Sequence, residues 1–187
     1  MRSFIAIELP EGVKSAISEL QQEFKKCKAD IRWVKPDNIH LTLKFLGDTE
    51  EKIFDSIVEA TKEACIVYKE FALGIKGVRV FPNLRAPRVL WVGISDNDSL
   101  TGLQKSIEDG LIKLGFSPEK RRFRPHLTLG RFKSSFGKEG LYDKIEEHKN
   151  ISLGLIEVKS LFLIKSELTP SGSEYTKIAG IDLKNEK

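Results

Sequence analysis

The chain has 187 residues, of which 40% are hydrophobic and 31% are charged. This balance is typical of a folded globular protein and argues against a disordered one. The net charge of +4 is mildly basic, so it permits a polyanionic partner such as RNA without demonstrating one. No run of about 18 apolar residues occurs, and the N-terminus lacks the features of a signal peptide. We therefore expect a cytoplasmic protein with no membrane segment.

The first predicted elements are a strand and a helix. Residues 3–7, SFIAI, are rich in β-branched and aromatic side chains, which is typical of a buried strand. A helix follows, because apolar side chains recur at steps of three and four residues at Val13, Ile17, Leu20 and Phe24. The tetrapeptide HLTL then occurs at residues 40–43.

A second helix and two strands are predicted in the middle of the chain. Residues 71–81 alternate like a strand, and residues 89–93, VLWVG, form another buried run. The helix is predicted at residues 50–68, with one face formed by Ile53, Ile57, Ala60 and Ala64.

The order strand, helix and HLTL then repeats. The second HLTL, at residues 126–129, begins 86 positions after the first, and the same offset aligns Ile5 with Trp91. Asp98 or Ser99 is the expected N-cap of the intervening helix, and Gly115 its expected stop. The apolar face of that helix is formed by Leu100, Leu103, Ile107, Leu111 and Leu114. Two further strands are predicted at residues 156–168 and 174–183.

This repeat predicts an α+β fold in which residues 1–187 form a single bilobal domain. We expect two pseudo-symmetric lobes, each with an antiparallel or mixed sheet flanked by helices. A site that takes residues from both lobes would lie in a cleft between them.

Strand alternation indicates what each HLTL presents. His40 and Thr42 share one face with Lys44, whereas Leu41, Leu43 and Phe45 share the other, apolar face. By the same rule His126 and Thr128 share a face, with Arg124 just upstream. Arg131 is an odd number of residues after His126, so alternation places it on the opposite face unless the strand twists or ends there.

Two histidines and two threonines that converge can cleave a phosphodiester without a metal or other cofactor. A neutral histidine takes a proton from the attacking hydroxyl or water, and an imidazolium protonates the departing oxygen. The threonine hydroxyls can donate to the nonbridging oxygens. Lys44, Arg124 or Arg131 can help to neutralise the phosphate charge.

Other interpretations compete for these and neighbouring residues. A single strand histidine is more often structural than catalytic, and a zinc site at His40 and His126 lacks a third ligand. Cys27 and Cys65 have no CxxC partner and are expected to be reduced. The basic run at residues 119–125 is either a solvated loop or a contact for RNA. His148 is expected at the surface, and Phe45, Leu46, Trp33 and Trp91 are expected to pack in the core.

The paired HxTx motifs resemble the two-histidine (2H) phosphoesterase superfamily. Within it, the stretches RSFIAIELP, HLTLKFLGD, FPNLRAPRVLWVGI and FRPHLTLGRF are most similar to the RNA 2′,3′-cyclic phosphodiesterases, also called 2′-5′ RNA ligases. The resemblance implies hydrolysis of a 2′,3′-cyclic phosphate to a 2′-phosphate. It also implies His40 as proton donor, His126 as proton acceptor, and Thr42 and Thr128 as phosphate-binding hydroxyls.

Three functions remain open at this point. The substrate of a hydrolase would be an RNA end, such as that of a tRNA fragment, or a cyclic nucleotide. The same site can instead join a cyclic phosphate end to a 5′-hydroxyl, which makes a 2′-5′ linkage. The third alternative is a protein that binds RNA ends without catalysing a reaction. We expect a monomer in each case.

Overall fold

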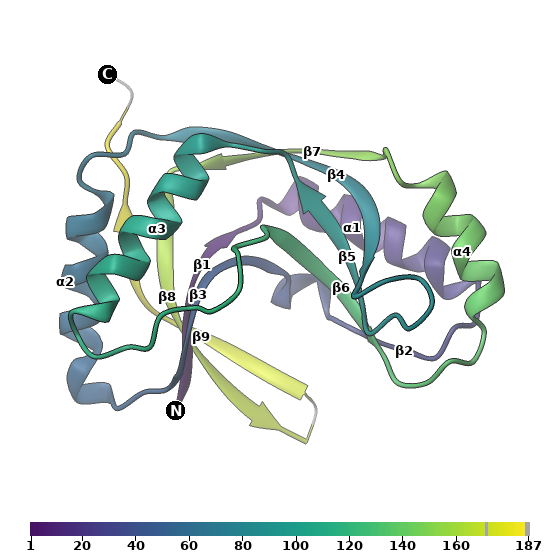
Figure 1. Cartoon of the computed structure of the whole chain (residues 1–187), viewed down its shortest axis with the longest axis horizontal. Coiled ribbons are helices and arrows are strands. Elements are labelled where there is room, and N and C mark those ends of the chain that lie inside the picture. Colours follow the sequence, from purple (N-terminus) through teal and green to yellow (C-terminus); the bar gives the residue numbers. More distant parts are fainter. Residues whose placement is uncertain (171, 186–187) are drawn as a thin grey trace.

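The structure, a computed structural model, describes residues 1–170 and 172–185 (Figure 1). Its strands are β1 (Arg2–Glu8), β2 (Ile31–Trp33), β3 (His40–Asp48), β4 (Phe71–Phe81), β5 (Val89–Ile94), β6 (His126–Phe132), β7 (Ser152–Val158), β8 (Ser160–Thr169) and β9 (Gly172–Asp182). Its α-helices are α1 (Glu11–Lys25), α2 (Phe54–Cys65), α3 (Asp98–Ile112) and α4 (Lys138–Glu147). Short 3₁₀ turns lie at Pro36–Asn38 and Glu51–Ile53.

Two antiparallel sheets form the centres of two lobes. Sheet A has the strand order β3-β1-β8-β9, and sheet B the order β2-β6-β5-β4-β7. In each sheet the HLTL strand pairs with the strand that opens its half of the repeat, β3 with β1 and β6 with β5. The expected α+β fold with two pseudo-symmetric lobes is therefore confirmed.

The helices inside the repeat are exchanged between the lobes. Along the chain α1 lies between β1 and β3, yet it packs against β7 of sheet B. In return α3, which lies between β5 and β6, packs beside α2 and against β3 of sheet A (Figure 1). Each lobe is thus completed by a helix from the other half of the repeat.

The apolar faces of the helices agree largely with their spacing. The four residues predicted for α1 are all buried, and so are the first four of α3. Leu114 lies beyond the end of α3 and is exposed, and the N-cap is Asn97 rather than Asp98 or Ser99. The Asn97 side chain accepts a hydrogen bond from the Leu100 amide at 2.9 Å. Gly115 has φ +92°, a left-handed conformation that suits the expected stop.

Two other element predictions need correction. The buried face of α2 consists of Phe54, Ile57, Thr61 and Cys65 rather than the face that contains the alanines. Residues 156–168 are not one strand: β7 belongs to sheet B and β8 to sheet A, and Lys159 separates them. Both strands alternate, and no glycine or proline marks the point where the chain changes sheets. The sequence pattern therefore looked continuous.

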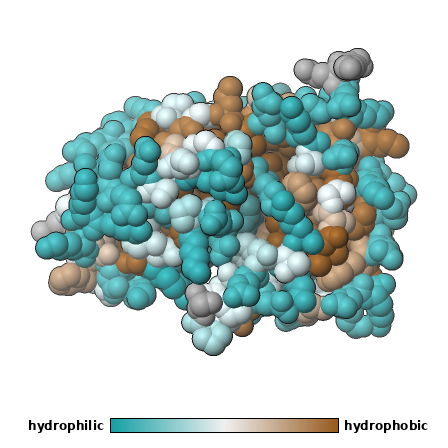
Figure 2. All heavy atoms as spheres, turned by 180° about the vertical axis from the view of Figure 1, so that it is seen from behind, coloured by the Kyte–Doolittle hydropathy of each residue, from teal (hydrophilic) through white to brown (hydrophobic). Residues whose placement is uncertain are grey.

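Buried side chains from both sheets and from the helices form one continuous hydrophobic cluster. A smaller cluster of Phe4, Ala6 and Ile164, with Phe162 and Tyr175 against it, is built on β1, β8 and β9 of sheet A. Hydrophilic side chains cover most of the face seen from behind, with apolar patches between them (Figure 2).

β3 contains a β-bulge at the last leucine of its motif. Thr42 lies opposite Ala6 and Lys44 lies opposite Ile5, so Leu43 has no partner residue on β1. A bulge reverses the alternation of the residues that follow it. Lys44 is therefore buried, and Phe45, which the alternation placed in the core, is 68% exposed.

β6 contains the same bulge at the equivalent leucine. Thr128 lies opposite Trp91 and Gly130 opposite Leu90, which leaves Leu129 without its own partner. The reversal turns Arg131 outward, where its side chain is exposed. Arg131 therefore has the position in β6 that Phe45 has in β3.

Lys44 links β3 to α3, the helix of the second half that packs against sheet A. Its Nζ lies 2.7 Å from Glu108 Oε1 and 2.8 Å from the Ser117 carbonyl oxygen. The two side chains are only 7% and 12% exposed. Glu108 Oε1 also accepts from the Glu119 amide at 2.6 Å, so the pair fixes the chain that leads into the second motif.

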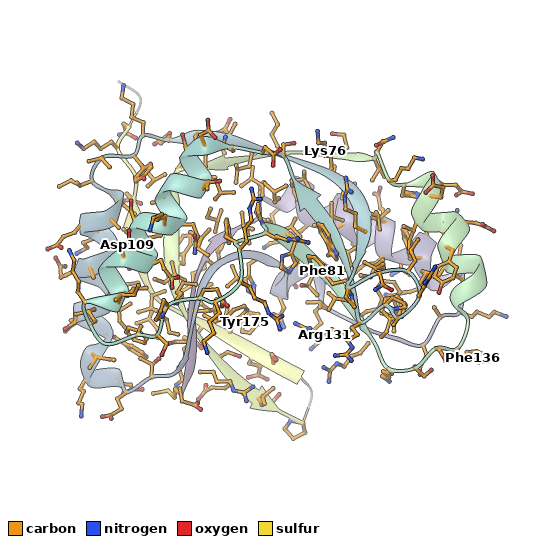
Figure 3. All side chains as sticks on the ribbon, viewed as in Figure 1. Lys76, Phe81, Asp109, Arg131, Phe136 and Tyr175 are labelled. Atoms are coloured by element: carbon orange, nitrogen blue, oxygen red, sulfur yellow. The ribbon has the colours of Figure 1, made fainter. Side chains whose placement is uncertain are left out.

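Substituting Glu108 by alanine should lower the free energy of unfolding by about 3–5 kcal/mol, because it leaves the Lys44 ammonium buried without its carboxylate. The matched control is Asp109→Ala on the same helix (Figure 3). Asp109 pairs with Lys105 at 3.1 Å on the exposed side, so we expect a loss below about 1 kcal/mol. Denaturant unfolding would measure both values. Equal losses would contradict a special role for the buried pair.

Candidate active site

His40 is held among aromatic side chains of sheet A. Its ring stacks on Phe4 with centroids 4.5 Å apart and planes 16° apart. The Tyr175 ring, from β9, meets it at 5.2 Å and 76°. The backbone of Asn38 also hydrogen-bonds to the imidazole. Three neighbours thus restrict how this ring can turn.

His126 has an equivalent environment in sheet B. Phe81 and Trp91 stack on each other at 4.4 Å, and both meet the imidazole nearly edge-on, at 5.2 and 5.7 Å. Its Nδ1 lies 2.7 Å from the Arg124 carbonyl oxygen. Because a carbonyl oxygen only accepts, Nδ1 carries the hydrogen, and Nε2 is the nitrogen left to accept a proton.

Trp91 was predicted to pack in the core, but its ring lies beside His126 instead. Lys44 and Gly130 each follow directly after an HLTL motif, so they have the same position in their strands. Ile5 is opposite Lys44, and Leu90 is opposite Gly130. Ile5 is therefore equivalent to Leu90, one residue before the Trp91 that the fixed offset selected. A slip of one residue moves a strand side chain to the opposite face. Trp33, in contrast, packs against the core as predicted.

Burial dominates the proton affinity of both histidines. It lowers the pKa of His40 to about 4, although the Asn38 hydrogen bond and the Glu8 carboxylate act in the opposite direction. Burial also lowers the pKa of His126 against the effect of the Arg124 carbonyl, and the Arg131 guanidinium lowers it further. The charge beside His40 therefore favours the imidazolium, and the charge beside His126 favours the neutral ring.

The two motif strands face a shared region. β3 and β6 contact each other, although they belong to different sheets. Burial raises the pKa of Tyr175, in sheet A, while Arg131 of sheet B lowers it, so these two side chains interact between the lobes. Tyr175, Arg131 and Phe81 all lie toward the middle of the molecule (Figure 3). Thr42 and Thr128 are half-buried, each two residues after its histidine.

The three cations expected near the phosphate have different positions. Lys44 is committed to Glu108 and the Ser117 carbonyl, so it does not present a free ammonium to the site. Arg124 has an exposed side chain, and its contact with His126 is made by the backbone. Arg131 is exposed and acts electrostatically on both His126 and Tyr175.

His148 is not the surface residue that its charged surroundings suggested. Its Nδ1 lies 2.8 Å from the Lys144 carbonyl oxygen and its Nε2 lies 3.1 Å from Glu23 Oε2. Its ring also meets Phe24 of α1 at 5.4 Å. It joins α4 to α1 and is not among the neighbours of either motif histidine.

Four contributors to the site were missed in the sequence. Phe4 and Glu8 lie on β1 and could be found only from its register with β3. Phe81 lies on β4 and Tyr175 on β9, far from the motifs along the chain. No local pattern marks them, because only the sheet topology brings them beside the histidines.

Among the described side chains, those of residues 1–137, 140–170 and 172–185, no three or more of His, Cys, Asp or Glu are grouped so that they could hold a metal ion. Cys27 and Cys65 are both free thiols. Across the same ranges, every helix is too short or too polar to cross a membrane.

The family model described as LigT-like phosphoesterase matches the chain twice, at residues 7–91 and 92–175. The chain belongs to the LigT-like phosphoesterase family. The two consecutive matches correspond to the two halves of the repeat, with one HxTx motif in each. This agrees with the resemblance inferred from the motifs.

Individual relatives support this membership. The RNA 2′,3′-cyclic phosphodiesterase of Methanothermobacter thermautotrophicus is 38% identical, over 94% of this chain and 95% of the relative. That of Methanocaldococcus jannaschii is 37% identical, over 94% and 96%. Among solved structures, TT0787 of Thermus thermophilus has a TM-score of 0.84 at 26% identity and full coverage of both chains. The E. coli LigT structure with 3′-AMP has a TM-score of 0.79 at 24% identity, covering 97% of each chain, which shows the fold.

The free protein should keep His40 neutral well below pH 6. Its imidazole NMR signals, assigned with a His40→Gln variant, should titrate near pH 4 rather than near the ordinary value of about 6.5. The folded pKa is lower than the unfolded one, so the unfolded chain binds this proton first on acidification. The free energy of unfolding should therefore fall as the pH decreases from about 6.5 to 4. A titration midpoint at or above pH 6.5 would contradict the burial argument.

Proposed function

We propose that this protein hydrolyses the 2′,3′-cyclic phosphate at an RNA end, or of a cyclic nucleotide, and leaves a 2′-phosphate. The observation that carries the proposal is the pair of HxTx strands, which bring two oriented imidazoles from different sheets to one region. The similarity to proteins named RNA 2′,3′-cyclic phosphodiesterase, over 94% of this chain, supports the same reaction.

In this reaction water attacks the phosphorus and the bond from phosphorus to the 3′ oxygen breaks. His126 accepts the proton of the water at Nε2, because Nδ1 is already engaged with the Arg124 carbonyl. His40, as imidazolium, gives its proton to the departing 3′ oxygen. The bond to the 2′ oxygen stays intact, so the product is a 2′-phosphate. A later exchange of one proton with solvent at each ring restores the starting state.

Thr42 and Thr128 donate hydrogen bonds to the nonbridging oxygens, and Arg131 supplies positive charge close to His126. Proton balance is complete with the two histidines, so the proposal requires no metal and no cofactor.

Two charges distinguish the otherwise similar histidines. Glu8 favours protonation of His40, and Arg131 disfavours protonation of His126, which supports His40 as the acid and His126 as the base. Burial favours the neutral form of both rings in the free protein. The negative charge of a bound phosphodiester favours the imidazolium, so substrate binding itself supplies the condition under which His40 holds its proton.

The finer expectations remain proposals. A tRNA fragment as the natural substrate, a monomeric state and a cytoplasmic location all stay predictions. The same site can use a 5′-hydroxyl in place of water, which would make the protein a 2′-5′ RNA ligase. A protein that binds RNA ends without turnover is the remaining alternative.

The first test is to identify the end group formed from an oligoribonucleotide with a 2′,3′-cyclic phosphate, in the presence of EDTA. We expect a 2′-phosphate, and a loss of turnover of at least about 100-fold in His40→Ala and in His126→Ala. His148→Ala is the matched control and should retain turnover, because that ring binds Glu23 instead.

Each other outcome has a defined meaning. A 3′-phosphate would exclude the proposed leaving group, and turnover that EDTA abolishes and zinc restores would support a metal site. Joined products with added 5′-hydroxyl RNA, in place of hydrolysis, would favour the ligase. RNA binding without any turnover in the wild-type protein would favour the binding module.

The roles of the two histidines can be separated with sulfur in place of the leaving 3′ oxygen. A thiolate departs without protonation, so His40→Ala should regain much of the wild-type rate on this substrate, at least about tenfold relative to the oxygen substrate. His126→Ala should regain little, because the attacking water still lacks its base. Measuring kcat for both variants on both substrates tests this. Recovery in His126→Ala alone would mean that the two roles are exchanged.

A further inference from the structure

Two helix glutamines have equivalent positions against the two motif strands. Gln21 of α1 is 1% exposed, and its Nε2 donates to the Leu129 carbonyl at 2.9 Å and to the Val34 carbonyl at 2.8 Å. Gln104 of α3 donates from Nε2 to the Leu43 carbonyl at 3.3 Å. In each case one acceptor is the last residue of an HLTL motif in the other half of the repeat.

Both acceptors are the bulged residues of their strands. The extra residue of a bulge has no partner residue of its own on the neighbouring strand, and a buried backbone carbonyl needs a hydrogen-bond donor. The exchange of α1 and α3 between the lobes brings a side-chain amide to each bulge. Leaving a buried carbonyl unsatisfied costs about 1–3 kcal/mol, so Gln104 favours the bulged form of β3 through the Leu43 carbonyl. The Leu129 carbonyl also accepts from the Val34 amide at 3.0 Å, so Gln21 is its second donor and bridges it to the Val34 carbonyl.

Each bulge immediately follows a motif threonine. Thr42 precedes Leu43 and Thr128 precedes Leu129, so each glutamine holds the carbonyl of the residue bonded directly to a motif threonine. The bulge also decides that Phe45 and Arg131 turn outward rather than into the core.

We propose that Gln104 and Gln21 are positioning residues that set the orientation of Thr42 and Thr128 through the Leu43 and Leu129 carbonyls. The inference rests on the proposed role of the threonines in holding the phosphate. Neither glutamine contacts the substrate in this scheme. Since each glutamine comes from a helix of the opposite half of the repeat, the pair also links the placement of each motif to the half of the chain that carries the other motif.

The first part of the test compares Gln104→Met and Gln21→Met with Gln22→Met. Methionine keeps the length of the side chain and removes the donor. Gln22 is the neighbouring residue on α1 and is exposed, so its variant serves as the matched control. On the cyclic phosphate oligoribonucleotide we expect kcat to fall about tenfold or more for the first two, with KM within about twofold of the wild-type value. The control should retain both parameters.

The second part asks whether each glutamine acts through its own threonine. In a Thr42→Ala background, Gln104→Met should reduce kcat little further, whereas in a Thr128→Ala background it should keep its full effect. Gln21→Met should show the reverse dependence. If a glutamine variant lowers kcat by the same factor in both threonine backgrounds, the inference is wrong. Such a result would indicate a general effect on folding, which does not discriminate between the motifs.

Failure of this inference can be told apart from failure of the proposed function. If Thr42→Ala and Thr128→Ala keep wild-type turnover, the phosphate-binding role of the threonines is wrong and the positioning role falls with it. If the threonine variants lose turnover while both glutamine variants retain it, only the positioning role is wrong. Thermal unfolding of each variant confirms that folded protein is assayed. Should Gln21→Met not fold, the less buried Gln104 provides the same comparison on its own.

Discussion

The extra residue at the end of each HLTL motif is the constraint on which the site depends. A regular strand would place Lys44 beside Thr42 and would bury Phe45 in the core. The bulge instead sends the Lys44 ammonium to Glu108 and turns Phe45 outward. The carbonyl of each bulged leucine accepts from a glutamine of the crossing helix, and that of Leu129 also accepts from the Val34 amide. The buried ion pair and the outward position of Phe45 are thus consequences of the same local irregularity.

Sequence periodicity predicted correctly on which face of the strand each side chain lies before the bulge, and it failed after the bulge. His40, Thr42, His126 and Thr128 precede the bulges, so alternation assigned them properly. Phe45 follows a bulge, and its predicted face was therefore wrong. No residue type signals the insertion, because leucine stands at both bulges and the ladder alone reveals them. The misassignment of Trp91 has a related origin, since one fixed offset was applied to strands whose true offset differs by one residue.

The helices show a different limit. Spacing identified which side chains of α1 and α3 are buried, because that face is a local property of the helix. It could not identify what covers the face, which depends on contacts far apart along the chain. The expectation of helix-flanked lobes was therefore correct, while the exchange of those helices went unforeseen. For the same reason Tyr175, brought to His40 by the order of strands in sheet A, had no signal in the sequence.

The exchanged helices also make the two halves of the repeat mutually dependent for stability. Sheet A needs α3 from the second half, and sheet B needs α1 and β2 from the first. A chain cut between the halves would leave apolar surface uncovered on both pieces, so neither would be an autonomous domain. Although the motif occurs twice, we expect the protein to unfold as one cooperative unit. The spacing of its two histidines is maintained for as long as the whole molecule remains folded.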